Sequence, residues 1–280
     1  MGHNGPTFSV AIPTKGRTGE LTELLRSISQ SSLRPSQIII VDQNDDDRLA
    51  GVISEFPDLP LAHHRVDFAG LSAAKNYAAR LATGEFVFTP DDDSRVFPST
   101  FESAIDTLAA TGADVVFGRS VDGNGNESIT RFRQDAGWLA RDRIDGMFVE
   151  PATAVRTQVL RGTPFDETLG VGTFHGAEEG YDWVLRLLSE QRRLYFEPAI
   201  TFFHPQTITD YGSSKALRRV FHYRAGFGRL CKKHGLWGKY LGRTALVASA
   251  IVVYSVTNRI KLRYYAAELA GLIAGVSVDP

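Results

Sequence analysis

The chain has 280 residues, of which 43% are hydrophobic and 22% are charged. This composition is typical of a globular protein with a sizeable core, and it excludes a disordered or low-complexity chain. A single cysteine excludes a disulfide within the chain. Residues 1–7 contain no apolar run, so we expect a flexible N-terminus and no secretory signal.

The net charge of −1 conceals an uneven distribution of charged residues. Tyr211–Ala267 contains twelve Lys and Arg but no Asp or Glu, which leaves 19 basic and 32 acidic residues in the rest of the chain. An acidic body with a basic tail indicates that the tail meets an anionic surface.

Short apolar runs alternate with amphipathic stretches in the N-terminal part of the chain. The apolar runs predict strands, and apolar side chains at helical spacing predict helices between them. The expected strands are 8–14, 37–44, 85–90 and 114–120, and the expected helices are 19–32, 71–84 and 99–112. This alternation predicts an α/β fold with a largely parallel sheet, right-handed crossovers and helices on both faces.

This rhythm changes after Val121, where a polar region without clear periodicity begins. We expect two further strands and one helix between them, at 147–157, 194–205 and 180–191 respectively. The tail begins at about Ser213 with a basic helix. Two apolar stretches follow at 244–256 and 264–276, and we expect both to be shorter than the roughly 20 residues that cross a bilayer.

Polar residues follow three of the predicted strands at their carboxyl ends. "PTKGR" follows the first strand, Asp42 ends the second, and Asp91, Asp92 and Asp93 follow the strand "EFVFTP". Ligands of open parallel sheets bind beyond the carboxyl ends of the strands. If these strands are neighbours, the three clusters converge on one crevice.

The three consecutive aspartates have more than one interpretation. An EF-hand loop is excluded because Val96 stands where such a loop needs glycine. A solvated acidic turn is an alternative. We favour a divalent cation, since a pair of carboxylates spaced Asp-x-Asp suits Mg²⁺ or Mn²⁺ when phosphate oxygens supply other ligands.

Other common enzyme motifs are missing from the sequence. It contains no phosphate-binding Gly-x-x-x-x-Gly-Lys-Ser/Thr, no Gly-x-Gly-x-x-Gly after the first strand, and no Gly-x-Ser-x-Gly. These absences argue against a P-loop enzyme, a Rossmann dinucleotide site and a serine hydrolase. We expect Cys231, in the basic helix, to have a packing role.

Several segments together resemble glycosyltransferase family 2, whose members have the GT-A fold. "SVAIPTKGR" is similar to the opening strand and turn of that family, and "IIIVDQN" to its second strand. "GLSAAKNYAARLATGEFVFTPDDD" resembles the helix and Asp-x-Asp block, and "TPFDETLG" with "GAEEGYDWVLRLL" resembles the acceptor-side segment. The resemblance covers most of residues 8–205.

The resemblance implies roles for individual residues of this chain. A nucleotide diphosphate sugar would be bound by Pro13, Thr14, Arg17, Asp42, Lys75, Asn76, Asp91 and Asp92. Lys75 stands where the family usually has Arg, and it lacks the planar fork of an arginine. A Mg²⁺ or Mn²⁺ ion would be bound by Asp93, Asp91 and His204. A structural, hydrogen-bonded His204 is an equal alternative.

The resemblance also places the catalytic base in the run Glu178-Glu179-Gly180-Tyr181-Asp182. This chain has one more residue between the acid pair and Asp182 than the family usually has. We take Glu179 as the first choice, and Glu178 and Asp182 stay open. A helix N-terminus stabilised by acidic residues is the alternative, although it hardly needs three of them.

The resemblance implies an inverting, metal-dependent glycosyltransferase that moves a sugar from a nucleotide diphosphate sugar to a hydroxyl, in polysaccharide or glycolipid synthesis. The expected domains are a GT-A catalytic domain at 8–210, whose halves are 8–121 and 122–210, and a helical region at 211–280.

The acceptor would be a saccharide or lipid-linked saccharide. The acidic body argues against nucleic acid as a partner. We expect a peripheral protein on the cytoplasmic face of the membrane, bound to anionic lipid through residues 211–267. A helical subdomain that packs on the catalytic domain is the alternative for the tail. The alternatives are a sugar nucleotidyltransferase and a non-catalytic scaffold that binds nucleotide sugars.

Overall fold

The computed structural model describes residues 5–206 and 210–279. The flexible N-terminus predicted for residues 1–7 therefore lies partly outside the described residues. The described chain divides into two compact units. The first comprises residues 5–68, 74–164 and 186–206, and the second comprises 69–73, 165–185 and 210–279.

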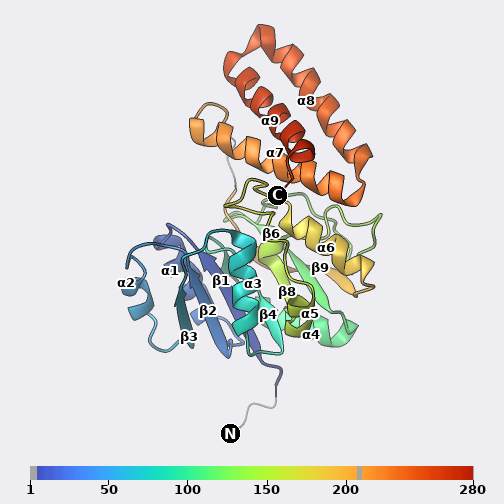
Figure 1. Cartoon of the computed structure of the whole chain (residues 1–280). Coiled ribbons are helices and arrows are strands. Elements are labelled where there is room, and N and C mark those ends of the chain that lie inside the picture. Colours follow the sequence, from blue (N-terminus) through green and yellow to red (C-terminus); the bar gives the residue numbers. More distant parts are fainter. Residues whose placement is uncertain (1–4, 207–209, 280) are drawn as a thin grey trace. The chain divides into compact units, whose positions relative to one another are not determined.

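The first unit is built on one sheet (Figure 1). Its strands are β1 (Phe8–Thr14), β2 (Gln37–Asp42), β3 (Leu61–Arg65), β4 (Phe86–Phe88), β5 (Arg95–Val96), β6 (Val115–Val121), β7 (Gly137–Trp138), β8 (Thr153–Arg156) and β9 (Leu194–Phe203). They follow the order β3-β2-β1-β4-β8-β6-β9-β5, and β7 pairs with β9. Buried β-branched residues fill β2, which explains its place inside the sheet.

The sheet mixes parallel and antiparallel pairs. β3, β2, β1 and β4 run parallel to one another, as the alternation of strands and helices predicts, and β6 and β9 also pair parallel. β8 is inserted antiparallel between β4 and β6, and β5 and β7 pair antiparallel with β9. The predicted α/β fold is confirmed, and its antiparallel strands all come after β4 in the chain.

Amphipathic helices complete the first unit. They are α1 (Gly19–Ser29), α2 (Ala50–Ser54), most of α3 (Leu71–Leu81), α4 (Thr100–Thr111) and α5 (Thr157–Gly162). Helix α1 buries the apolar residues that its spacing predicts, Leu21, Leu24, Leu25 and Ile28. The strand predicted at 147–157 is shorter, because Glu150–Ala152 forms a 3₁₀ turn around Pro151, which has no N–H to donate to a ladder.

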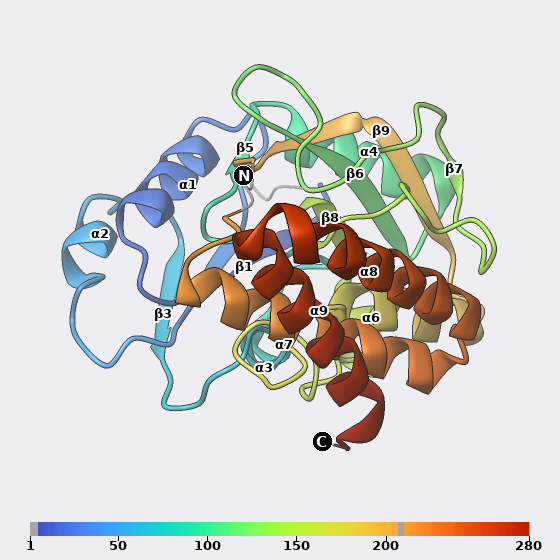
Figure 2. The ribbon, with the colours of Figure 1, turned by 90° about the horizontal axis from the view of Figure 1, so that it is seen from above.

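The second unit contains the start of α6 (Glu179–Ser189) and the helices α7 (Ser214–His234), α8 (Trp237–Thr257) and α9 (Arg259–Ser277). These three tail helices lie side by side in both views (Figures 1 and 2). Glycines let α9 approach α7 closely: a Cβ on Gly271 would lie 2.3 Å from the carbonyl oxygen of Phe221. The buried carboxylate of Glu268 accepts hydrogen bonds from Arg224 on α7 and Arg243 on α8.

The length of α8 corrects one sequence-based expectation. The apolar stretch at 244–256 is part of a helix of 21 residues that begins at Trp237 and includes Lys239 and Arg243. Its mean hydropathy is 1.3 and only 6% of its apolar window is buried. By length and composition alone α8 could cross a membrane, so the prediction that it is too short is wrong.

The close contact of α7 and α9 can be tested with paired glycine substitutions. We expect Gly271→Ala to lower the free energy of unfolding by about 1–3 kcal/mol, because its methyl group would overlap the α7 backbone. The control is Gly242→Ala on α8, where nothing lies within 4 Å of the added Cβ. This variant should be neutral or more stable by up to about 1 kcal/mol. Denaturant unfolding followed by circular dichroism measures both. Equal stabilities of the two variants would contradict the contact.

Candidate functional site

The carboxyl ends of four strands bring the predicted clusters together in the first unit. Thr14 at the end of β1 pairs with Asp42 at the end of β2, which pairs with Arg65 at the end of β3. β4 pairs with the other side of β1 and leads through Thr89 and Pro90 into the aspartate triplet. The condition for convergence, adjacency of these strands, is met.

The first contact across this edge is made by Asp92, the middle acid of the triplet. Thr14 Oγ1 donates to Asp92 Oδ2 at 2.7 Å, and Arg17 Nη1 donates to Asp92 Oδ1. Arg17 Nη2 also lies 2.8 Å from Asp93 Oδ2. Burial raises the pKa of Asp92, although Arg17 and Thr14 favour its charged form. Both carboxylate oxygens of Asp92 therefore tie the triplet to the turn after β1.

The outer acids of the triplet form a candidate metal site with His204. One ligand atom each from Asp91, Asp93 and His204 can be chosen so that all lie within 4.8 Å of one another. The ring of His204 is oriented by its Nδ1, which lies 2.8 Å from the carbonyl oxygen of Pro205. That contact places the proton on Nδ1 and leaves the lone pair of Nε2 toward the acids. His204 reaches this place because β9 pairs with β5, which follows the triplet.

The donor set of this cluster fits a divalent cation. His204 Nε2 lies 3.4 Å from Asp93 Oδ1 and 3.9 Å from Asp91 Oδ2. Asp93 Oδ1 is buried and accepts no hydrogen bond from the described residues. Two carboxylate oxygens and an imidazole nitrogen that face one another with unused lone pairs suit a cation between them. Burial raises the pKa of Asp91 to about 6, and the positive charge of Lys75 opposes this rise.

Lys75 and Asn76 lie buried on α3, the helix that precedes β4 and the aspartate triplet in the chain. Lys75 Nζ forms an ion pair with Glu150 Oε2, and the lysine side chain is fully buried. A buried ammonium requires a counter-charge, so its pairing follows from its burial. The sequence does not single out Glu150 because "FVEPA" looks like the interior of a strand.

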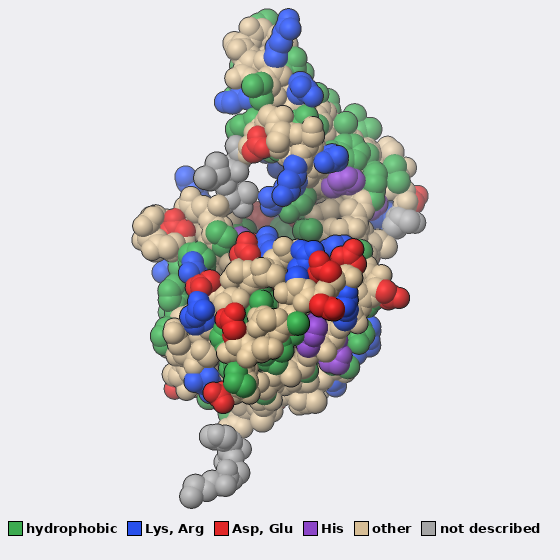
Figure 3. All heavy atoms as spheres, turned by 90° about the vertical axis from the view of Figure 1, so that its left-hand side faces the viewer, with side chains coloured by type: hydrophobic (Ala, Val, Ile, Leu, Met, Phe, Trp, Pro, Cys, Tyr) green, Lys and Arg blue, Asp and Glu red, His purple; other side chains and the backbone are tan. Residues whose placement is uncertain are grey.

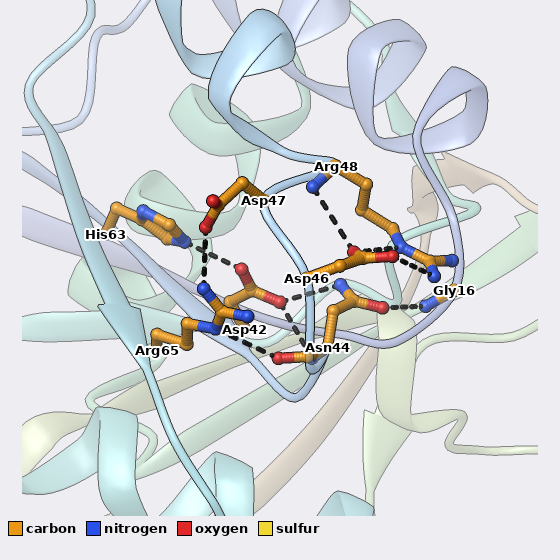
Figure 4. Close-up of polar contacts among 8 residues, drawn as sticks. All are labelled: Gly16, Asp42, Asn44, Asp46, Asp47, Arg48, His63 and Arg65. Carbon is orange, nitrogen blue, oxygen red and sulfur yellow. Dashed lines mark hydrogen bonds and ion pairs between the residues drawn. The ribbon is translucent and has the colours of Figure 1, made fainter.

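Asp42 is nearly inaccessible and is bound by other protein groups (Figure 4). Asp42 Oδ1 accepts from the backbone N and from Nδ2 of Asn44, at 2.9 and 2.6 Å. Asp42 Oδ2 lies 2.9 Å from His63 Nε2 on β3. Asn44 Oδ1 in turn accepts from the backbone N of Gly16 at 2.6 Å, so this network fixes the turn after the buried Pro13. His63 is not predicted as a site residue, because β3, "LAHHR", has no apolar run that would predict a strand.

The three candidate bases belong to the second unit. Glu178 directly precedes α6, Glu179 begins it, and Asp182 lies in its first turn. Glu178 has a positive φ of 74°, a conformation that is uncommon for a residue other than glycine and is often found at functional sites. Glu179 is 5% exposed. A Cβ on Gly170 would lie 3.0 Å from Glu179 Cδ, so the Glu179 carboxyl group packs against the Gly170 backbone.

Asp182, in the first turn of α6, is bound directly by basic side chains of α7. Its side chain is fully buried, and its Oδ1 lies 2.7 Å from both Lys233 Nζ and His234 Nε2. Lys233 Nζ also lies 2.6 Å from Asp166 Oδ2. Burial alone would raise the pKa of Asp166, but the hydrogen bonds from Lys233 and Thr168 lower it. No feature of the sequence indicates that the basic tail supplies these partners.

Comparisons with other sequences identify the family of this chain. The model of the family "Glycosyl transferase family 2" matches residues 9–165. An "Uncharacterized glycosyltransferase YwdF" of Bacillus subtilis is 35% identical over 96 residues, which are 34% of this chain and 35% of that protein. An "Uncharacterized glycosyltransferase" of Haemophilus influenzae is 24% identical over 193 residues, 65% of this chain and 62% of that protein. The matches thus span about a third and about three fifths of these relatives.

Solved structures with low sequence identity share the fold. The structure of TarS residues 1–349 from S. aureus has a TM-score of 0.62 at 15% identity, and the match covers 96% of this chain and 90% of that one. The mannosyltransferase PcManGT from Pyrobaculum calidifontis, in complex with GDP-Man and Mn²⁺, has a TM-score of 0.64 at 15% identity, over 98% and 88% of the two chains. With more than half of its length matched by the family model, the chain belongs to glycosyltransferase family 2.

Proposed function

We propose that this protein transfers a glycosyl group from a nucleotide diphosphate sugar to an acceptor hydroxyl, with inversion at the anomeric carbon. The observation that carries the proposal is the cluster of Asp91, Asp93 and His204 at the strand ends of a family 2 chain. TarS has been solved with UDP and with UDP-GlcNAc, and the Pyrobaculum enzyme with GDP-Man and Mn²⁺. These complexes support a nucleotide sugar as the donor.

In this proposal Asp91, Asp93 and His204 hold a Mg²⁺ or Mn²⁺ ion. Such an ion neutralises the charge that grows on the departing nucleotide diphosphate. Arg17, which forms ion pairs with Asp92 and Asp93, contributes on the diphosphate side. Lys75, fully buried and paired with Glu150, and the buried Asn76 support this side without direct contact. Pro13, Thr14 and Asp42 shape the site for the nucleoside. Because Asp42 is 1% exposed and bound to Asn44 and His63, we assign it the role of ordering that site.

We assign the role of catalytic base to Glu179. An acceptor hydroxyl is a weak nucleophile, and a nearby carboxylate that takes its proton speeds the attack. Asp182 is a poorer choice, since its carboxylate is fully buried and Lys233 and His234 bind it. Ion pairs of this kind lower the basicity of a carboxylate. Glu178 is the remaining competitor, and its positive φ keeps it under consideration.

The surface of the helical tail supports our proposal that it binds an anionic membrane. Apolar side chains stand exposed along α8, including Leu246 at 67%, Val252 at 71% and Val256 at 86%. Exposed basic side chains accompany them on α7 and α9, namely Lys215, Arg218, Arg219, Arg259 and Arg263. In Figure 3, Lys and Arg dominate the charged side chains of the tail helices, whereas both signs mix on the α/β unit. Apolar area together with cations is the combination that anionic lipid surfaces attract.

This location fits a lipid-linked saccharide as the acceptor and a role in polysaccharide or glycolipid synthesis. Nucleotide sugars and anionic lipid would meet at the cytoplasmic face of a membrane, so we propose that the enzyme acts there. Each basic residue near such a surface contributes about 1 kcal/mol. A sugar nucleotidyltransferase would instead show pyrophosphate exchange, and a scaffold would bind the nucleotide sugar without turnover.

The metal site is tested by Asp93→Asn, which keeps the shape of the side chain and removes its charge. We expect Mn²⁺-dependent binding of UDP-GlcNAc or GDP-Man to be lost, because Asp93 supplies a buried ligand oxygen. Binding is measured as the rise in unfolding temperature with Mn²⁺ and nucleotide sugar, compared with EDTA. The matched control is Asp106→Asn, an exposed acid on α4. A Mn²⁺-dependent rise of wild-type size in Asp93→Asn would contradict the assignment.

The base is tested by Glu179→Gln, with Glu178→Gln and Asp182→Asn as comparisons. We expect Glu179→Gln to lose about a hundredfold or more in kcat while donor affinity is retained, since removal of a base affects proton transfer. Release of UDP or GDP from the two donors, in water or with a saccharide acceptor, gives kcat. If Glu178→Gln is inactive and Glu179→Gln is active, Glu178 takes the role of base.

The membrane surface is tested by the double variant Val252→Glu with Val256→Glu, which places two charges on the exposed face of α8. We expect the wild-type chain to sediment with vesicles that contain phosphatidylglycerol, less so at high salt and least in the double variant. Ile129→Glu is the control, because Ile129 is an exposed apolar residue of the first unit at 50%. Wild-type protein that stays in the supernatant with anionic vesicles would refute this proposal.

A further inference from the structure

Helix α7 contacts the segment in front of the acid pair through its backbone. The backbone N of Gly176 donates to the carbonyl oxygen of His222 at 2.9 Å. His222 Nδ1 lies 3.0 Å from the carbonyl oxygen of Phe174. A Cβ on Gly226 would lie only 2.5 Å from the carbonyl oxygen of Ala177, so the two backbones touch at that point. All of these residues belong to the second unit.

The last turn of α7 binds Asp182, which follows the acid pair in the chain. Lys233 Nζ and His234 Nε2 each lie 2.7 Å from Asp182 Oδ1, and the Asp182 side chain has no exposed surface. Lys233 also pairs with Asp166, which belongs to the segment before Gly170. A carboxylate buried to this extent needs its charge compensated, and here residues of the tail compensate it.

Asp182 is joined to the acid pair through the first turn of α6. The backbone N of Asp182 donates to the carbonyl oxygen of Glu178 at 2.9 Å. The position of Asp182 therefore sets that of Glu178, whose positive φ marks a backbone conformation held by its surroundings. Glu179 is the next residue, and its carboxyl group rests on Gly170. Helix α7 thus contacts the chain on both sides of the acid pair, between residues 174 and 182.

We propose that Lys233 and His234 are positioning residues that hold the candidate base of α6 in place by binding Asp182. This inference rests on the proposed function, since it concerns the same acid pair. Without Lys233 the buried Asp182 carboxylate loses a cation that binds it and turns toward water. The first turn of α6 then loses its anchor, and the carboxylate of Glu179 is misplaced for the acceptor. Small displacements of a catalytic group are costly in rate.

The test compares Lys233→Met with Lys232→Met. Lys232 is its neighbour on α7 and pairs with Asp279, whose side chain is 74% exposed. We expect Lys233→Met to lower kcat at least tenfold, with the KM for UDP-GlcNAc or GDP-Man changed by less than about twofold, because the donor site is not involved. Lys232→Met should keep both values. Lys233→Arg should recover most of kcat, and adding Asp182→Asn to Lys233→Met should recover part of it by removing the buried charge.

A second readout needs no substrate and separates this inference from the proposed function. Amide hydrogen exchange of the peptide spanning residues 174–184 should be faster in Lys233→Met than in Lys232→Met. His234→Leu, which keeps Lys233, should show the same change if Lys233→Met does not fold. Equal exchange rates, or a loss of kcat that only follows the folded fraction, would overturn the positioning role. Faster exchange in a protein that turns over no nucleotide diphosphate sugar would retain the positioning role and refute the proposed function.

Discussion

Compensation of buried carboxylates is the constraint on which much of this structure depends. Asp91, Asp92 and Asp93 follow β4 directly, and burial raises the pKa of the first two. Arg17, Lys75 and His204 come from three distant parts of the chain, and the strand order brings them to the triplet. Arg17 binds two of the acids and Glu150 takes the charge of Lys75. The remaining negative charge at Asp91 and Asp93 is what a divalent cation would offset.

The same constraint explains part of the basic tail in the second unit. Glu268 and Asp182 are fully buried. Arg224 of α7 and Arg243 of α8 bind Glu268, and Lys233 of α7 binds Asp182. Arg224, Arg243 and Lys233 therefore turn inward and serve folding, whereas residues such as Arg218 and Arg263 face outward. The basic residues of Tyr211–Ala267 thus fall into two groups. Inward cations match buried acids, and outward cations belong to the surface for which we propose contact with anionic lipid.

The sequence predicted the parts of the fold that depend on local pattern. The bounds of β1 and the buried face of α1 follow from hydrophobic periodicity, and the strand-end acids follow from parallel pairing. β3 could not be predicted, because its half-buried "LAHHR" has no apolar run, and His63 was missed with it. The pairs Lys75–Glu150 and Lys233–Asp182 join residues far apart in sequence. No local signal records such pairs, since burial creates the need for a partner and only the tertiary fold selects which one.

The division of the tail into inward and outward cations also decides how its two proposed roles, membrane binding and positioning of the acid pair, can be separated. A truncation near Gly212 would remove the exposed face of α8 together with Lys233 and His234. Loss of activity after such a truncation could come from loss of the proposed membrane binding or from a misplaced acid pair. Helix α9 cannot be removed alone, because Gly271 and Gly275 pack against the backbone of α7. Substitutions of outward side chains on α8 leave the contacts of α7 with Asp182 intact, so the membrane role and the positioning role can be measured independently.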